Sequence, residues 1–174
     1  MDMKRQNLVL TGFMGSGKTS VGLKLSYRLR MPVEDTDKLI ERREGCSVSD
    51  IFRNKGEAYF RQLETELLRE LTQSKSVKIY SVGGGTPVRP ENRELLRKLG
   101  LVVYLRLRPE TVYERLKDDT ARPLLQCEDP LKKIKELMQD RKAAYEESAD
   151  VILDVDTMTL EQIQDSIIMK VTGR

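Results

Sequence analysis

A glycine-rich segment near the N-terminus carries the residue types that bind a triphosphate. Residues 12–19, GFMGSGKT, complete the pattern G-x-x-x-x-G-K-[ST]. In such a loop the glycines let backbone N–H groups surround a phosphate, and the following helix adds its positive N-terminal end. Lys18 would reach the β- and γ-phosphates, and the Thr19 hydroxyl would be a ligand of Mg²⁺. A strand-to-helix turn without a ligand is the alternative, but the complete motif favours a nucleoside triphosphate site.

Two acidic residues end the second predicted strand. Residues 30–37 finish in the segment DTD, which holds Asp35 and Asp37. Two carboxylates beside a phosphate loop can hold Mg²⁺ through water and accept a hydrogen bond from a substrate hydroxyl. The same segment is equally typical of a turn or helix cap ahead of Leu39 and Ile40. The residues alone leave both interpretations open.

An arginine and a run of glycines could bind a second ligand. Arg61 lies in the segment FRQLE, residues 60–64, on a predicted helix. A guanidinium offers a bidentate fork for a carboxylate or phosphate, although an arginine on a helix is more often one solvated charge among many. The run Gly83-Gly84-Gly85 directly follows a predicted strand. Three glycines there usually mark a place where a ligand approaches the backbone, and a flexible loop is the alternative.

Two further arginines complete the candidate residues. Arg122 begins the segment RPLL, in a polar loop that could close over a nucleotide and neutralise charge on a transferring phosphoryl group. Arg141 and Tyr145 share a helical face at i and i+4, a spacing that is more often a packing pair than a ligand site. The chain has no His, so a catalytic base must be Asp, Glu, Lys or Tyr.

Composition and charge limit the class of protein. The 174 residues are 39% hydrophobic and 34% charged, which suits a single domain over residues 1–174. The net charge of +3 is spread along the chain without a basic block, so no nucleic-acid partner is expected and small anionic ligands are favoured. Cys46 and Cys127 have no metal-binding or redox-motif spacing and suit reduced thiols. With no signal peptide and no membrane span predicted, a cytoplasmic location is expected.

Strands and helices alternate along the chain. Apolar runs predict strands at 8–10, 30–37, 77–82, 101–105 and 151–153. Helical spacing and end signals predict helices at 21–29, 38–43, 47–52, 55–72, 90–99, 110–117, 131–147 and 159–171. This order predicts a three-layer α/β/α fold with a five-stranded parallel sheet. Because ligands bind at the carboxyl ends of such strands, the glycine-rich loop, the two aspartates and the triple glycine should meet in one crevice.

Taken together and in order, these segments resemble the shikimate kinase family. The motifs GFMGSGKT, DTD, FRxxE, GGG, RPLL and RxxxY extend over essentially the whole chain; the first is specific only to the P-loop superfamily, and the next four are specific to the family. The resemblance implies a P-loop NTPase fold with a mobile lid at about 117–125 and a shikimate-binding helical region at about 36–62. The implied reaction transfers the γ-phosphate of ATP to the 3-hydroxyl of shikimate, in aromatic amino acid biosynthesis.

The resemblance also implies roles for individual residues. The catalytic residues would be Lys18, Asp37 and Arg122. Asp37 would be the base that accepts the proton of the shikimate hydroxyl. Thr19 and Asp35 would hold Mg²⁺, Asp35 through water. ATP would be bound by Gly15, Ser16, Gly17, Lys18, Thr19, Ser20, Arg115 and Arg122. Shikimate would be bound by Asp37, Arg61, Gly83, Gly84, Gly85 and Arg141, the two arginines clamping its carboxylate.

Some implied details concern the nucleotide and the metal. Arg115 would stack near adenine, with residues 154–157 nearby. Ser81 stands at the end of the third predicted strand, where many P-loop enzymes carry an Asp for the metal, and it would contribute to Mg²⁺ binding through water. The protein is expected to act as a monomer on shikimate and ATP.

Two other functions are compatible with a P-loop. A kinase acting on a gluconate-like substrate or a nucleoside monophosphate would need another acceptor pocket, and a nucleotide would need several arginines on its phosphate. The pair Arg61 and Arg141 with the triple glycine suits a single carboxylate better. A non-catalytic ATP-binding regulator needs neither a base nor a lid arginine, so Lys18, Asp37 and Arg122 favour an enzyme.

Overall fold

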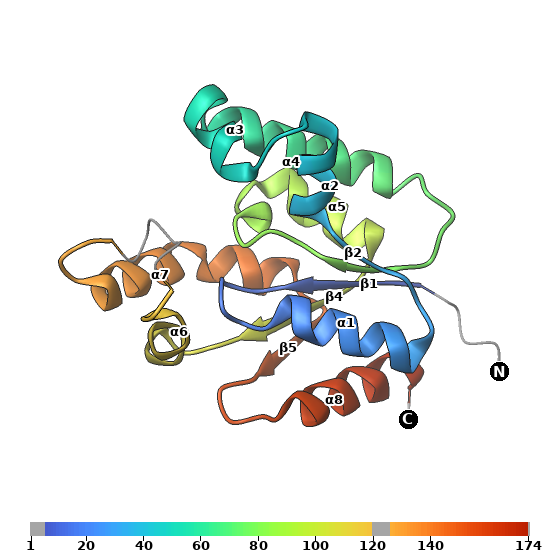
Figure 1. Ribbon diagram of the computed structural model, residues 1–174. Helices are drawn as coiled ribbons and strands as arrows, with labels where there is room; N and C mark the ends of the chain where they lie inside the picture. The colour runs from blue at the N-terminus through green and yellow to red at the C-terminus, as the bar shows by residue number, and fades with distance from the viewer. Residues whose placement is uncertain (1–5, 120–125, 174) are drawn as a thin grey trace.

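Five parallel strands form the sheet predicted from the sequence. The computed structural model describes residues 6–119 and 126–173. The strands are β1 (Asn7–Thr11), β2 (Val33–Asp35), β3 (Ile79–Ser81), β4 (Gly100–Arg106) and β5 (Val151–Asp154). Their spatial order is β2-β3-β1-β4-β5 (Figure 1). Leu8 of the central strand β1 pairs with Ile79 on one side and with Leu101 on the other, so the loop after β1 begins in the middle of the carboxyl edge.

Helices cover both faces of this sheet. They are α1 (Lys18–Leu29), α2 (Thr36–Glu44), α3 (Val48–Lys55), α4 (Glu57–Leu71), the 3₁₀ helix η1 (Thr86–Val88), α5 (Pro90–Leu99), α6 (Pro109–Leu116), α7 (Pro130–Ser148) and α8 (Leu160–Thr172). Side chains of a strand alternate between the two faces. Accordingly, Leu8 and Leu10 share a core cluster with α1 and α8, whereas Val9 shares one with α4 and α5. The predicted three-layer α/β/α architecture is confirmed.

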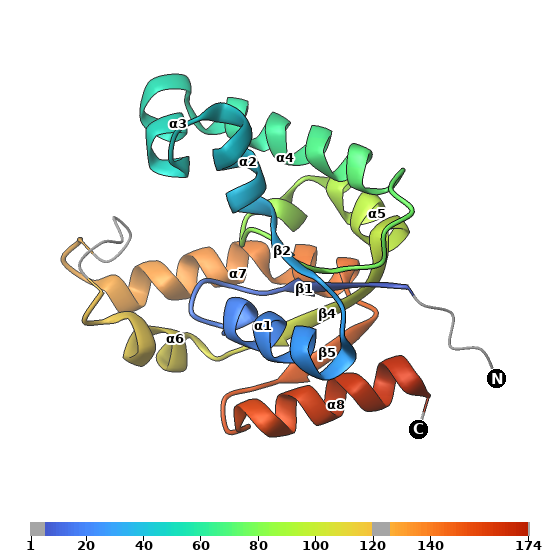
Figure 2. The same cartoon turned by 45° about the vertical axis from the view of Figure 1, so that its right-hand side comes forward.

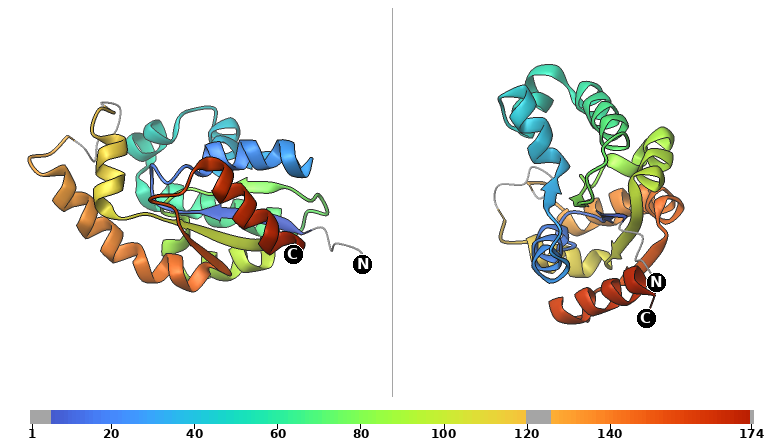
Figure 3. Two further views of the ribbon diagram at one scale, coloured as in Figure 1. Left: turned by 90° about the horizontal axis from the view of Figure 1, so that it is seen from below. Right: turned by 90° about the vertical axis from the view of Figure 1, so that its right-hand side faces the viewer.

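Helices α2, α3 and α4 form a group that stands beyond β2, at the opposite end of the molecule from α8 (Figures 2 and 3). The group has a small core of its own, built from Ile40, Ile51, Phe60 and Leu67. Leu68 of α4 packs instead with Val9 in the cluster against the sheet. The group therefore packs against the sheet through α4 and is joined to it by the direct connection from β2 to α2.

Several element boundaries differ from those predicted. Strand β3 begins at Ile79 instead of at 77, because the Lys78 amide donates to Oδ1 of Asn7 at 2.8 Å. The helix predicted at 55–72 begins only at Glu57, because Gly56 takes φ 85° and ψ 167° and separates α3 from α4. The 3₁₀ helix η1, directly after the triple glycine, was not predicted from the sequence.

Two further predictions concern membrane-spanning helices and the lid. No helix within residues 6–119 and 126–173 is long and apolar enough to cross a membrane. Residues 120–125, which include Arg122 and most of the predicted lid, lie outside the described residues.

Candidate active site

One cavity at the carboxyl ends of β1, β2 and β3 holds most of the candidate residues. It has a volume of about 770 Å³ and is lined by the glycine-rich loop, α2, α4, the segment after β3, and α7. The predicted site residues in its lining are Gly15, Gly17, Lys18, Thr19, Ser20, Asp35, Asp37, Arg61, Gly83, Gly84, Gly85 and Arg141. The residues predicted for the nucleotide and those predicted for the acceptor therefore face one space.

The glycine-rich loop joins β1 to α1 in a tight turn. Gly15 and Gly17 have φ angles of 77° and 88°, in the left-handed region that favours glycine. Gly17 is the N-cap of α1, so the unpaired N–H groups of the first helical turn begin directly after the loop. Nζ of Lys18 donates to the carbonyl oxygens of Gly12 at 2.7 Å and of Phe13 at 3.2 Å. These bonds hold the ammonium group against the loop.

Ser16 of the loop and Arg115 beside it lie outside the lining of the cavity. Ser16 is buried, and its Oγ has no hydrogen-bond partner among the described residues. Nη1 of Arg115 donates to the carbonyl oxygen of Gly15 at 2.9 Å. The fold thus brings an arginine of α6, 100 residues away in sequence, to the rim of the phosphate loop.

Asp35 and Asp37 lie on either side of the start of α2. Asp35 ends β2 and is the N-cap of α2, where Oδ1 accepts a hydrogen bond from the Lys38 amide at 3.2 Å. Asp37 lies in the first turn of α2, one residue into the helix. Both also line the cavity. Asp35 therefore caps a helix and faces the cavity as well, so the two interpretations of the DTD segment do not exclude each other.

Asp37 is a half-buried residue whose carboxyl group lies among other acids. Burial is the main cause that raises its pKa from 3.8 to about 6, and the charges of Asp35 and Glu64 add to this. Lys18 and Arg61 act in the opposite direction and favour the ionised form. Oδ1 of Asp37 has no hydrogen-bond partner among the described residues. Because Asp37 lines the cavity, its carboxylate could accept a proton from a substrate there.

Arg61 is held by two acidic residues of its own helix. Its Nη1 donates to Oε2 of Glu64 at 2.7 Å, and its Nε and Nη2 donate to Oε1 of Glu57 at 3.2 Å and 3.1 Å. The guanidinium also lies directly against Gly85, where a Cβ atom would overlap it. The close approach that the triple glycine predicts is thus made at Gly85 by a side chain of the protein itself.

Helix α7 contributes Arg141 and Tyr145 to the same region. The Tyr145 hydroxyl donates to the carbonyl oxygen of Gly84 at 2.5 Å, and Nη1 of Arg141 donates to the same oxygen at 3.4 Å. Burial raises the pKa of Tyr145, so its hydroxyl keeps its hydrogen. The Tyr145 ring stacks on Tyr104, with 4.9 Å between the ring centroids. Tyr145 therefore packs and anchors the glycine segment, while Arg141 reaches the cavity.

Glu57, Glu64 and Thr86 were not predicted as site residues, although each touches this region. Glu64 follows Arg61 at i+3 and Glu57 precedes it at i−4, both spacings at which helical side chains meet. That periodicity could have identified the two acids. Thr86 donates from Oγ1 to Oε1 of Glu64 at 2.5 Å, a contact between segments that the sequence did not indicate.

The oxygen atoms near the loop are suited to Mg²⁺. Thr19, Asp35 and Ser81 all line the cavity. Within the described residues no group of three or more His, Cys, Asp or Glu side chains could hold a metal ion by itself. Mg²⁺ is usually bound by one or two protein oxygens together with phosphates and water. The residues present therefore fit a metal that is held largely by a nucleotide.

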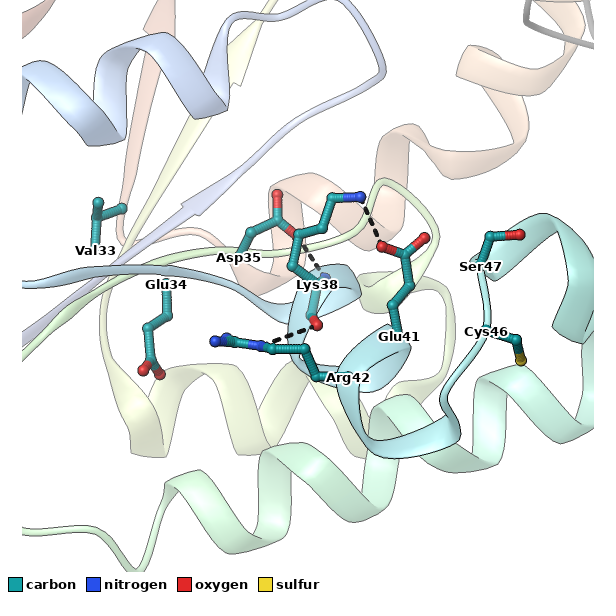
Figure 4. A pocket seen from close by; sticks show the side chains of 8 residues that line it. All are labelled: Val33, Glu34, Asp35, Lys38, Glu41, Arg42, Cys46 and Ser47. Atoms are coloured by element: carbon teal, nitrogen blue, oxygen red, sulfur yellow. Dashed lines mark hydrogen bonds and ion pairs between the residues drawn. The ribbon is translucent and has the colours of Figure 1, made fainter.

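A second hollow lies at the outer edge of β2 and α2 and extends to Cys46 and Ser47 (Figure 4). It shares Asp35 with the first cavity but includes no residue of the glycine-rich loop. Lys38 donates to Glu41 at 2.6 Å, and Nε of Arg42 donates to the carbonyl oxygen of Lys38 at 3.4 Å. Its charged side chains thus have partners within the protein, and the larger set of convergent groups remains in the first cavity.

A phosphate loop at the centre of a parallel sheet, sharing one cavity with an aspartate and two arginines, defines a P-loop kinase of small molecules. The family model described as shikimate kinase matches residues 14–172. The chain therefore belongs to the shikimate kinase family. It is an ATP-dependent phosphotransferase that acts on shikimate, as the resemblance of its motifs predicted.

Individual relatives agree with this membership. The chain is 41% identical to the shikimate kinase of Caldanaerobacter subterraneus subsp. tengcongensis, covering 97% of this chain and 99% of that protein. It is 35% identical to the structure of shikimate kinase from Acinetobacter baumannii in complex with shikimate, with a TM-score of 0.89 and coverage of 98% and 95%. The structure of shikimate kinase from Aquifex aeolicus is 33% identical, with a TM-score of 0.79 and 97% coverage of both chains. The predicted P-loop NTPase fold is confirmed.

Proposed function

We propose that this chain, acting as one domain over residues 1–174, transfers the γ-phosphate of ATP to the 3-hydroxyl of shikimate in the cavity of about 770 Å³. The observation that carries the proposal is the shared lining of that cavity. Lys18 of the phosphate loop, Asp37 and Arg61 all face it. A donor site and an acceptor site that share one space are what direct phosphoryl transfer needs.

The phosphate loop would bind ATP. Residues 15–20 offer backbone N–H groups at a helix N-terminus, and Lys18 would exchange the carbonyl oxygens of Gly12 and Phe13 for oxygens of the β- and γ-phosphates. Thr19 and Asp35 would hold Mg²⁺, with Ser81 contributing through water. When bound, Mg²⁺ neutralises charge on the phosphate oxygens. Arg115, already bonded to Gly15, would lie beside the nucleotide.

Asp37 would be the base for the shikimate hydroxyl. Asp37 lines the cavity, and its pKa of about 6 leaves it ionised at neutral pH yet able to take up a proton. Lys18 is close enough to favour the ionised form. The proposed base would then lie near the group that would bind the transferring phosphate.

Arg61 and Arg141 would bind the shikimate carboxylate. Of the five N–H groups of the Arg61 guanidinium, three are donated to Glu57 and Glu64. Among the described residues, one N–H group on Nη1 and one on Nη2 therefore have no acceptor. A carboxylate that approaches the end of the guanidinium could accept both. Arg141 reaches the cavity from α7, beside Gly84. Two cations converging from separate helices suit one small planar anion.

Other parts of the proposal depend on the motifs alone. Arg122 would neutralise charge on the transferring phosphoryl group from a lid at about 117–125. Residues 36–62 would form the shikimate-binding region. A monomeric state and a cytoplasmic location remain predictions.

The test is a direct comparison of acceptors. ADP release is measured with ATP, Mg²⁺ and, in turn, shikimate, quinate, gluconate and nucleoside monophosphates. ATP consumption is expected only with shikimate. Equal or better turnover of another acceptor would contradict shikimate as the substrate, and ATP binding without turnover of any acceptor would favour a regulator.

A further inference from the structure

A chain of buried polar side chains lies beneath the triple glycine. Glu64 and Thr65 come from α4, Thr86 begins η1, and Asn92 lies in the first turns of α5. Each of the four has at most 3% of its surface exposed. Buried polar groups are costly unless they are hydrogen-bonded, so the partners of these four side chains show what the cluster holds in place.

The hydrogen bonds of the cluster lead to Arg61. Nδ2 of Asn92 donates to the carbonyl oxygen of Thr86 at 2.9 Å, and Oγ1 of Thr86 donates to Oε1 of Glu64 at 2.5 Å. The other carboxylate oxygen of Glu64, Oε2, accepts from Nη1 of Arg61 at 2.7 Å. Oγ1 of Thr65 lies 2.8 Å from Oδ1 of Asn92 and closes the far end of the chain.

The Thr86 hydroxyl makes a hydrogen bond to Glu64 that an apolar group of the same size could not make. The Glu64 side chain is 1% exposed, so water cannot take over a bond that Thr86 gives up. A short bond from a hydroxyl to a carboxylate is of the strong, charge-assisted kind. Without it, Oε1 of Glu64 would be buried and unpaired, and only the bond from Arg61 to Oε2 would still orient the carboxylate.

We propose that Thr86 and Asn92 are positioning residues for the acceptor site: through Glu64 they fix the orientation in which Arg61 presents its guanidinium to the shikimate carboxylate. This rests on the proposed function, in which Arg61 binds that carboxylate. Asn92 fixes the backbone of Thr86, and Thr86 fixes one oxygen of Glu64 while Arg61 holds the other. Gly85 allows the guanidinium to lie close to the same turn of backbone.

The test removes the Thr86 hydroxyl without changing the size of the side chain. In Thr86→Val the KM for shikimate is expected to rise about 5- to 10-fold, the equivalent of one net hydrogen bond of about 1 kcal/mol or somewhat more. The kcat and the KM for ATP should stay within about twofold. Thr86→Ser, which keeps the hydroxyl, should restore the KM for shikimate. Thr172→Val is the matched control, because the Thr172 hydroxyl bonds within α8 to Ile168.

Two further comparisons separate positioning from general damage. Urea unfolding of each variant shows whether it is folded, and if Thr86→Val is not, Thr86→Ala removes the same hydroxyl from a smaller side chain. In an Arg61→Lys background, where the fork is already lost, Thr86→Val should change the KM for shikimate by less than about twofold. An equal rise in both backgrounds would overturn the proposal.

Different results would contradict the positioning role of Thr86 and the proposed binding of shikimate by Arg61. A normal KM for shikimate in Thr86→Val, together with a raised KM in Arg61→Lys, would overturn the positioning role and leave the carboxylate clamp intact. A wild-type protein that does not phosphorylate shikimate, or an Arg61→Lys variant with an unchanged KM, would instead contradict the proposed function itself.

Discussion

Asp37 and Glu64 place two carboxylates against the same point of the backbone. A Cβ atom on Gly83 would lie 2.7 Å from Oδ1 of Asp37 and 3.0 Å from Oε1 of Glu64. Glu64 is bonded to Arg61 and Thr86, whereas Oδ1 of Asp37 has no partner within the described residues. Glu64 is thus fixed in an ion pair, whereas Asp37, which also lines the cavity, is the acid that we propose as the base.

The rate is expected to depend on the ionisation of Asp37. Burial, then the charges of Asp35 and Glu64, raise its pKa to about 6. Protonated Asp37 cannot accept the proton of the shikimate hydroxyl, so kcat/KM for shikimate should fall about tenfold for each pH unit below that value. ADP formation in quenched samples from pH 4.5 to 8.5 measures this directly. In Asp37→Asn this fall of kcat/KM at low pH should disappear, and kcat at pH 8 should be lower by about 10²-fold. If the variant shows the same fall with the same midpoint, another group is responsible for it.

The same shift has a cost in stability. The ordinary pKa of an aspartate is 3.8, and the pKa of Asp37 in the folded chain is about 6. Between these pH values Asp37 is therefore mostly protonated in the folded chain and mostly ionised in the unfolded chain. Stability is therefore lost as the pH rises through this window, by up to roughly 3 kcal/mol. Asp37→Asn should raise the free energy of unfolding at pH 7 by about 1 to 3 kcal/mol and less at pH 4.

Urea unfolding at the two pH values checks this gain. Glu136→Gln, which changes an exposed acid on α7, is the control and should alter the unfolding free energy by less than about 0.5 kcal/mol. A lower stability of Asp37→Asn at pH 7 would show that ionised Asp37 stabilises the folded state, against this expectation.

Arg61→Lys should weaken shikimate binding more than catalysis. A lysine keeps the charge but cannot offer two N–H groups in one plane, so the KM for shikimate is expected to rise roughly tenfold or more. The KM for ATP should hardly change. Arg69→Lys, on the same helix in an exposed pair with Glu91, is the matched control. Initial rates at varied shikimate decide, and an unchanged KM in Arg61→Lys would remove Arg61 from the clamp.

The fold could be predicted from the sequence because its signals are local. The alternation of apolar runs with helical periodicity gave all five strands and the three layers, and the glycine-rich motif located the carboxyl edge. Boundaries were less accurate where one residue or a distant partner sets them. Gly56 moves the boundary between the two helices predicted at 47–52 and 55–72, so that α3 continues to Lys55 and α4 begins at Glu57. The Lys78 amide bonds to the Asn7 side chain, and β3 begins only at Ile79.

The site was predicted as a set of residues but not as a set of contacts. Motif order indicated that Asp37, Arg61 and Arg141 would share a crevice. The contact of Arg61 with Gly85, the unpaired oxygen of Asp37 and the bond from Thr86 to Glu64 depend on how α2, α4 and η1 pack. Such distances between segments leave no periodic pattern in the sequence.

The requirement for Mg²⁺ should involve the Thr19 hydroxyl. In Thr19→Val one oxygen ligand is replaced by a methyl group, so the free Mg²⁺ concentration for half-maximal activity is expected to rise at least about tenfold. Thr19→Ser keeps the oxygen and should behave like the wild type. Activity is measured over a series of free Mg²⁺ concentrations at saturating shikimate, after removal of metal with EDTA. If Thr19→Val and Thr19→Ser show the same Mg²⁺ dependence, the hydroxyl is not a ligand.

Gly85→Ala should disturb Arg61 without changing any charge. An added Cβ would overlap the guanidinium, so the side chain must leave Glu64 or the backbone must shift, at a cost of about 1 to 3 kcal/mol. We expect a lower free energy of unfolding in urea and a raised KM for shikimate, with the KM for ATP preserved. Gly84→Ala is the reference for stability, because its Cβ would meet its nearest neighbour at an ordinary 3.5 Å. Equal stability of the two variants would show that Arg61 does not need the space at Gly85.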